Sequence, residues 1–159
     1  MDFSTLWFGV ALVGLVTAAL VFFYWIGRSK QKTLADPSAA QEAFARRRPE
    51  LQATFFAAAS ASGKPRGLRW KECQWSDQIE WIREKATGQL LALVGVTISF
   101  EAIEGGDMEG VEAVGNLRDA TAVFFFDGAD WRTVGRVVFN LGPKEALLHF
   151  QSGYERVEL

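Results

Sequence analysis

The sequence predicts an α+β protein: one N-terminal transmembrane helix, then a small domain with a helix packed on a roughly five-stranded antiparallel sheet and a short C-terminal helix. Three observations predict this fold. Residues Phe3–Gly27 form 25 consecutive residues without a charge. Residues 38–63 are rich in alanine and place apolar residues on one helical face. After Gly67 the apolar period changes to two, which is typical of strands.

The first element, within residues 1–32, is predicted to be a permanent membrane anchor with a basic flank. A bilayer core about 30 Å thick requires roughly 20 helical residues. A cleaved signal peptide is less favoured, because the run is too long and ends in the bulky FFYWIG. A buried core helix is the other alternative. Arg28, Lys30 and Lys32 follow the span, so we expect an inner-membrane protein with its N-terminus outside and its domain cytoplasmic.

The predicted span has two kinds of functional position. Small residues permit close approach of a second helix, although they are common in any transmembrane helix. Amphipathic aromatic and basic residues favour the membrane interface. The predicted helix-docking residues are Ala11, Gly14, Thr17 and Ala18, and the predicted interface residues are Trp7, Tyr24, Trp25, Arg28, Lys30 and Lys32.

Residues 33–67 are predicted to form a linker and a kinked helix. Asp36 is a suitable N-cap, and Pro37 fits the first helical turn. Pro49 lacks the N–H that a continuing helix needs, so we expect a kink or a restart there. Gly63 is a natural end for the second helical piece.

Residues 68–159 are predicted to form the sheet domain and its C-terminal helix. Residues 68–75 and 78–86 are expected to be two strands, followed by a turn at ATGQ. Further strands are expected at residues 120–126 and 131–141 around the turn DGAD, and a short helix lies within GPKEALLHFQSG. The clearest strand has apolar residues at every second position: Leu90, Ala92, Val94, Val96, Ile98, Phe100 and Ala102.

The sequence contains few candidates for catalysis. A single cysteine, Cys73, excludes an internal disulfide and a cysteine-cluster metal site, and His149 is the single histidine. A Cys73–His149 pair is the one conceivable nucleophile and base. No glycine-rich loop for phosphate precedes a helix. The acidic loop with Glu104, Asp107, Glu109 and Glu112 could bind calcium, but its spacing fits no calcium loop. We therefore predict no enzyme activity, no cofactor and no metal.

Charge is distributed unevenly along the domain. Residues 42–72 carry a net charge of +4 and residues 73–159 carry −7. A basic surface beside an anionic leaflet gains about 1 kcal/mol per charge, although a solvated helix face is the ordinary explanation. Nucleic acid is not expected, because the domain as a whole is acidic. The residues predicted to contact a partner protein or membrane lipid are Arg46, Arg47, Arg48, Lys64 and Arg66.

Two resemblances add to this interpretation. The order of elements is similar to the cone-shaped α+β folds of the cystatin and nuclear-transport-factor-2-like type, which implies a fold and little about function. Three segments resemble parts of short uncharacterised bacterial single-pass membrane-anchored proteins, and together they cover about a third of the chain. They are ASGKPRGLRWKECQW, FEAIEGGDMEGVEAVGNLRDATAVFFF and GRVVFNLGPKEAL. This second resemblance implies membrane attachment and no functional residues.

The function predicted from these features is that of a non-catalytic accessory or adaptor subunit of a larger bacterial membrane protein complex, of photosynthetic, respiratory or secretion type. Other membrane protein subunits and lipid are the expected partners. Trp70, Trp75 and Trp81 are expected to be exposed for such contacts. One alternative is a membrane-tethered cone-fold domain that binds a small ligand or is an enzyme. Another is a scaffold subunit similar to the inner-membrane component of type IV secretion.

Overall fold

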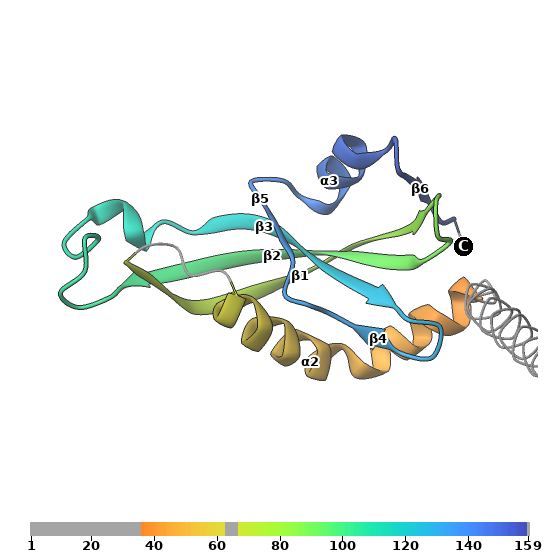
Figure 1. Cartoon of the computed structure of the whole chain (residues 1–159), viewed down its shortest axis with the longest axis horizontal. Helices are drawn as coiled ribbons and strands as arrows, with labels where there is room; N and C mark the ends of the chain where they lie inside the picture. Colours follow the sequence, from red (N-terminus) through yellow and green to blue (C-terminus); the bar gives the residue numbers. More distant parts are fainter. Residues whose placement is uncertain (1–35, 63–66, 159) are drawn as a thin grey trace, which may run out of the picture. The chain divides into compact units, whose positions relative to one another are not determined.

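The computed structural model describes residues 36–62 and 67–158. These residues form a twisted antiparallel sheet between two helices, with α2 on one face and α3 on the other (Figure 1). The elements in chain order are α2 (Pro37–Ser62), β1 (Leu68–Glu84), β2 (Leu90–Ala102), η1 (Glu112–Gly115), β3 (Arg118–Phe126), β4 (Trp131–Arg132), β5 (Val137–Phe139), α3 (Pro143–Phe150) and β6 (Tyr154–Arg156).

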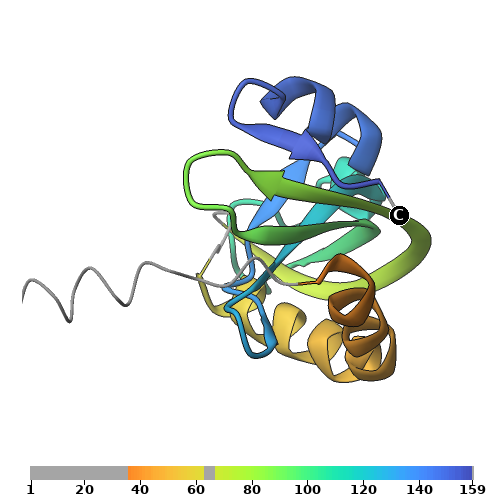
Figure 2. The same ribbon diagram turned by 90° about the vertical axis from the view of Figure 1, so that its right-hand side faces the viewer.

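The described strands form one six-stranded sheet in the order β4-β3-β2-β1-β6, with β5 also paired to β3. The long strands β1 and β2 pair over almost their full length, from Leu68 opposite Ala102 to Arg83 opposite Leu90. Turning the view by 90° shows that the strongly curved sheet separates the two helices (Figure 2). The sheet therefore has two buried surfaces, a large one under α2 and a smaller one under α3.

Helix α2 begins as the sequence predicts. The N–H of Ser38 donates to Oδ1 of Asp36 at 3.1 Å, so Asp36 caps the helix. The helix then runs through Pro49 as one element to Ser62 and does not restart. Buried residues on both sides of the proline, including Phe44 and Phe55, pack both halves of the helix on the sheet.

The predicted register of β2 is confirmed. Val94, Val96 and Ile98 are buried in one cluster with Phe55 of α2. The cluster contains many aromatic rings that contact one another. The ring of Phe44 makes edge contacts with the rings of Trp81, Phe124 and Trp131, at centroid distances of 5.4, 5.3 and 5.1 Å. Such edge-to-face contacts are favourable in addition to the burial of area.

The expectation that three tryptophans of β1 are exposed is wrong. Trp70 is only 7 % exposed. Trp75 and Trp81 are partly buried against the same cluster. The register shifts of β1 place the three tryptophans opposite Phe100, Val96 and Ala92, which share one face of β2, and this face lies against α2. These aromatics therefore stabilise the domain rather than present a contact surface.

The predicted strand count is also wrong. The two strands expected in residues 68–86 are one strand, β1, with a register shift between Trp75 and Ile79 that bends the strand without ending it. The strand expected over residues 131–141 is divided into β4 and β5. Strand β6 was not expected, because its three residues are too few to show a period of two.

The division between β4 and β5 has a steric cause at Gly135. This residue has φ +73° and lies directly against the backbone of α2. A Cβ atom at Gly135 would lie 2.7 Å from the carbonyl carbon of Ala58. The chain therefore leaves the extended conformation here and crosses close to the helix, which only glycine permits.

The predicted fold class is correct in being α+β but wrong in combining a transmembrane helix with five strands. Within residues 36–62 and 67–158, no helix is long and apolar enough to cross a membrane. The span predicted at Phe3–Gly27 lies outside the described residues. So do the predicted docking and interface residues Trp7, Ala11, Gly14, Thr17, Ala18, Tyr24, Trp25, Arg28, Lys30 and Lys32, and the predicted contact residues Lys64 and Arg66.

Candidate functional site

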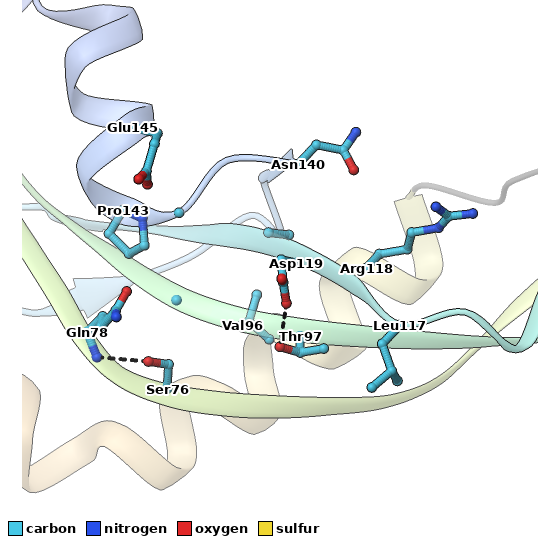
Figure 3. Close-up of a pocket in the computed structure, with 13 residues that line it drawn as sticks. Ser76, Gln78, Val96, Thr97, Leu117, Arg118, Asp119, Asn140, Pro143 and Glu145 are labelled. Carbon is cyan, nitrogen blue, oxygen red and sulfur yellow. Dashed lines mark hydrogen bonds between the residues drawn. The ribbon is translucent and has the colours of Figure 1, made fainter.

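The second face of the sheet is divided into an apolar half and a polar half. Leu91 and Leu93 of β2 are buried in the cluster that α3 covers. At the following alternate positions β2 carries Gly95 and Thr97, and these line an open groove of about 730 Å³. Figure 3 shows the groove between β1, β2, β3 and the start of α3. Its polar lining residues include Ser76, Gln78, Thr97, Asp119, Asn140 and Glu145.

The floor of the groove is formed where β1 shifts its register. There the Ser76 hydroxyl accepts a hydrogen bond from the N–H of Gln78 at 3.0 Å. From α2, the Arg48 guanidinium donates to the carbonyl of Ser76 at 2.6 Å and fixes this bend. A Cβ atom at Gly95 would lie 3.1 Å from Cβ of Ser76 and 3.6 Å from Cδ of Pro143. A glycine at position 95 therefore lets β1 approach β2 closely at Ser76, whereas the separation from Pro143 would be an ordinary contact.

One wall of the groove is built by the segment that connects β5 to α3. Thr97 and Asp119 are cross-strand partners, and the Thr97 hydroxyl donates to Oδ1 of Asp119 at 2.9 Å. The carbonyl of Asp119 accepts the N–H of Asn140 at 2.8 Å. Asn140 has φ +61°, a left-handed conformation that asparagine tolerates better than most residues. The buried Thr121 hydroxyl donates to the carbonyl of Leu141 at 2.8 Å and fastens the same segment.

The charged groups of the groove are mainly acidic. Asp119 lies at the start of β3, and Glu145 lies in the first turn of α3, where the helix dipole favours a negative charge. Figure 3 shows that the guanidinium of Arg118 extends away from Asp119. The groove therefore offers hydroxyl, amide and carboxylate groups that can accept and donate hydrogen bonds to a polar chain segment.

The structure separates the one conceivable nucleophile–base pair. Cys73 packs against the cluster under α2, on one face of the sheet. His149 lies on α3, on the other face, and its ring contacts Phe150 at a centroid distance of 4.9 Å. Burial, with a smaller contribution from Glu72, raises the pKa of the Cys73 thiol to about 11. A thiol with so high a pKa is a poor nucleophile near neutral pH.

The acidic loop, whose spacing fits no calcium loop, is ordered by a hydrogen bond of its own. Glu109 accepts the N–H of Gly105 at 2.8 Å, so its carboxylate closes the loop on itself. In the part of the chain that the structure describes, no three His, Cys, Asp or Glu side chains lie close enough together to hold a metal ion.

The described basic residues of α2 all have acidic partners within the domain. Hydrogen bonds to Glu50 and Asp130 raise the pKa of Arg47 above its ordinary value. The contact of these arginines with lipid or a partner protein stays a prediction. The ion pairs are Arg46–Glu42 at 3.6 Å, Arg47–Glu50 at 2.7 Å, Arg47–Asp130, and Arg48–Asp77 at 3.1 Å.

The sequence did not identify the groove, although it contains a signal for it. The even positions of β2 are apolar throughout, whereas the odd positions change from leucine at 91 and 93 to glycine at 95 and threonine at 97. A strand buried along its full length on both faces would carry apolar residues at its odd positions as well as at its even ones. Asp119 and Glu145 join the groove from distant parts of the chain, which only the fold brings together.

No family model, no curated protein and no solved structure matches the chain.

Proposed function

We propose that this protein is a non-catalytic accessory subunit of a larger membrane protein complex and that its C-terminal domain is the binding module. The observation that carries the proposal is the polar groove beside α3, an ordered concave surface left open between well-packed elements. The membrane location rests on sequence alone. The separation of Cys73 and His149 on opposite faces of the sheet supports a binding role rather than catalysis by this pair.

A small-ligand site is the second candidate function. The groove volume of about 730 Å³ lies within the range of roughly 300–1,000 Å³ that is usual for such sites. Sites of that kind are predominantly apolar, however, with a few placed polar groups. The lining here is polar at most positions, which favours a polar segment of a partner protein over a drug-sized molecule.

The test is co-purification from the native membrane in mild detergent, with identification of the proteins that co-migrate. Thr97→Trp places an indole in the groove and should abolish the co-purification of partner proteins. Thr54→Trp is the matched control, because Thr54 is exposed on α2 and away from the groove. The proposal is wrong if the wild-type protein migrates alone, and the groove is the wrong surface if both variants retain the same partners.

A further inference from the structure

One edge of the sheet is open along most of a strand. Strand β1 pairs with β2 on one side, from Leu68 to Arg83. On its other side, β6 pairs only with Ile82–Glu84, at one end of the strand (Figure 1). Among the described residues, no strand pairs with this side of β1 from Leu68 to Glu80. Such an edge presents unpaired N–H and C=O groups, to which another strand can add.

Two irregularities of β1 shape this open edge, and the first of them limits its length. A register shift between Trp75 and Ile79 removes the residues between them from the pairing with β2. There Arg48 of α2 donates to the carbonyl of Ser76 at 2.6 Å. Because such a shift bends the strand, the regular open edge ends at Trp75. Residues 68–75 are therefore defined as the edge segment, which is long enough for a complete strand, since strands usually have about 5–6 residues.

The second irregularity lies inside the edge segment, where Lys71 is an additional residue opposite β2. Trp70, before it, and Cys73, after it, both face the cluster under α2. In a regular strand, residues three positions apart lie on opposite faces. Residues opposite each other in an antiparallel pair must share a face. Two copies of the edge segment can therefore overlap completely, with Trp70 opposite Cys73 and Arg69 opposite Gln74.

The edge segment also carries two charges that the domain itself leaves unpaired. Lys71 and Glu72 are exposed neighbours of opposite sign. Neither makes an ion pair with another described residue, whereas the other charged side chains between Leu68 and Glu80 all do. Those pairs are Arg69–Glu101 at 2.7 Å, Arg48–Asp77 at 3.1 Å and Arg156–Glu80 at 2.8 Å.

Charge and symmetry together identify a second copy of the chain as the occupant. The midpoint of the edge segment lies between Lys71 and Glu72. Complete antiparallel overlap therefore places Lys71 of each copy opposite Glu72 of the other. Opposite charges at opposed positions stabilise a strand pair, and like charges destabilise it. A shift by one residue would place Lys71 opposite Lys71 or Glu72 opposite Glu72, and it would also mismatch the two faces.

We propose that the protein forms a symmetric dimer in which the edge segments of two copies pair antiparallel, with Lys71 of each copy opposite Glu72 of the other. The two sheets then form one continuous sheet, and the α2 helices of both copies lie on the same face of it. The contact uses the same surface of both copies, so the assembly closes at two. The dimer goes beyond the proposed function, because it does not depend on what the groove binds.

The first experiment is disulfide crosslinking of the full chain, purified in mild detergent. Opposite residues of an antiparallel pair have Cα atoms about 4.5–5.5 Å apart, which a disulfide can bridge. Arg69→Cys with Gln74→Cys, in a Cys73→Ser background, should therefore give a crosslinked dimer. The two single-cysteine variants are the matched controls, because each position lies about 17 Å along the strand from its own copy. They should give about tenfold less crosslinked dimer, since that separation is too long for a disulfide.

The second experiment measures the dissociation constant of the dimer by sedimentation equilibrium of the full chain in density-matched detergent. Lys71→Glu alone and Glu72→Lys alone should each weaken the dimer about tenfold, because two attractive charge pairs become repulsive. The double variant Lys71→Glu with Glu72→Lys restores opposite charges and should restore the wild-type dissociation constant. Glu112→Lys is the matched control, because Glu112 is exposed on η1 and outside the edge segment.

The dimer is supported if the double-cysteine variant crosslinks and the double charge variant recovers the affinity that each single reversal loses. A protein that stays monomeric at every concentration overturns it. So does a dimer that neither charge reversal weakens, because its contact then lies elsewhere in the chain. An adduct between the double-cysteine variant and a different co-purifying protein also overturns it, because another strand then occupies the edge. The co-purification test with Thr97→Trp decides the proposed function separately.

Discussion

Gly135→Ala tests the closest approach of the β4–β5 segment to α2. Gly135 has φ +73°, and an added Cβ would lie 2.7 Å from the carbonyl carbon of Ala58 and from Cα of Ala59. The left-handed conformation costs alanine about 1–2 kcal/mol. Overpacking costs about 1–3 kcal/mol, and helix backbone atoms yield less readily than side chains. The expected total is about 2–5 kcal/mol, a large part of the roughly 5–15 kcal/mol that stabilises a domain.

Gly105→Ala is the matched control. Gly105 has the same φ of +73°, but nothing lies within 4 Å of its added Cβ. The control should lose only the conformational part, so the difference of about 1–3 kcal/mol measures the packing against α2. The assay is urea unfolding of residues 34–159, a compact unit, followed by tryptophan fluorescence. Equal losses in the two variants would refute the close approach.

Four further predictions concern the core and two titratable groups. Phe100→Ala should destabilise the domain by about 3–5 kcal/mol in the same urea assay, because the side chain is buried at 9 % exposure; a loss below 1 kcal/mol would contradict the packing. Trp131→Phe should cost about 1–3 kcal/mol, because it removes the 2.6 Å hydrogen bond from the indole N–H to the carbonyl of Ala40. Cys73, with its pKa raised to about 11 by burial, should carry about two orders of magnitude less thiolate at pH 8 than in the unfolded chain; its reaction with Ellman's reagent should therefore be slow until urea is added. Asp127 has its pKa lowered to about 2 by two backbone N–H groups of its turn and by an arginine. Because this pKa is below the unfolded value, the ionised carboxylate stabilises the fold above about pH 4 and this contribution is lost as the pH falls toward 2. Asp127→Asn should therefore flatten the fall in unfolding free energy over that window, and an unchanged pH profile would contradict it.

Local signals in the sequence were sufficient for several elements. Asp36 and Pro37 predicted the start of α2, and the alternating apolar residues of β2 predicted its buried face toward Phe55. These signals operate over a few residues, because capping and alternation depend on nearest neighbours. The turn before Trp131 and the short helix that begins at Pro143 were predicted for the same reason.

The wrong predictions concern features that depend on distant contacts. The break of the strand at Gly135 arises from the backbone of α2, more than seventy residues earlier in the chain. The burial of Trp70 depends on which face of β1 lies under the helix. A period of two identifies a strand with two different faces, but it does not determine which face another element covers.

The sequence by itself therefore determined the α+β class, the start of α2 and the register of β2. It also showed how few catalytic side chains the chain has. Only the tertiary structure decided the rest. It merged two expected strands into β1, buried the tryptophans, placed Cys73 and His149 on opposite faces, and assembled the groove from Ser76, Thr97, Asp119 and Glu145. The physical reason is that alternation and capping are fixed by neighbouring residues, whereas a groove exists only where elements distant in the chain approach and leave part of a sheet face uncovered.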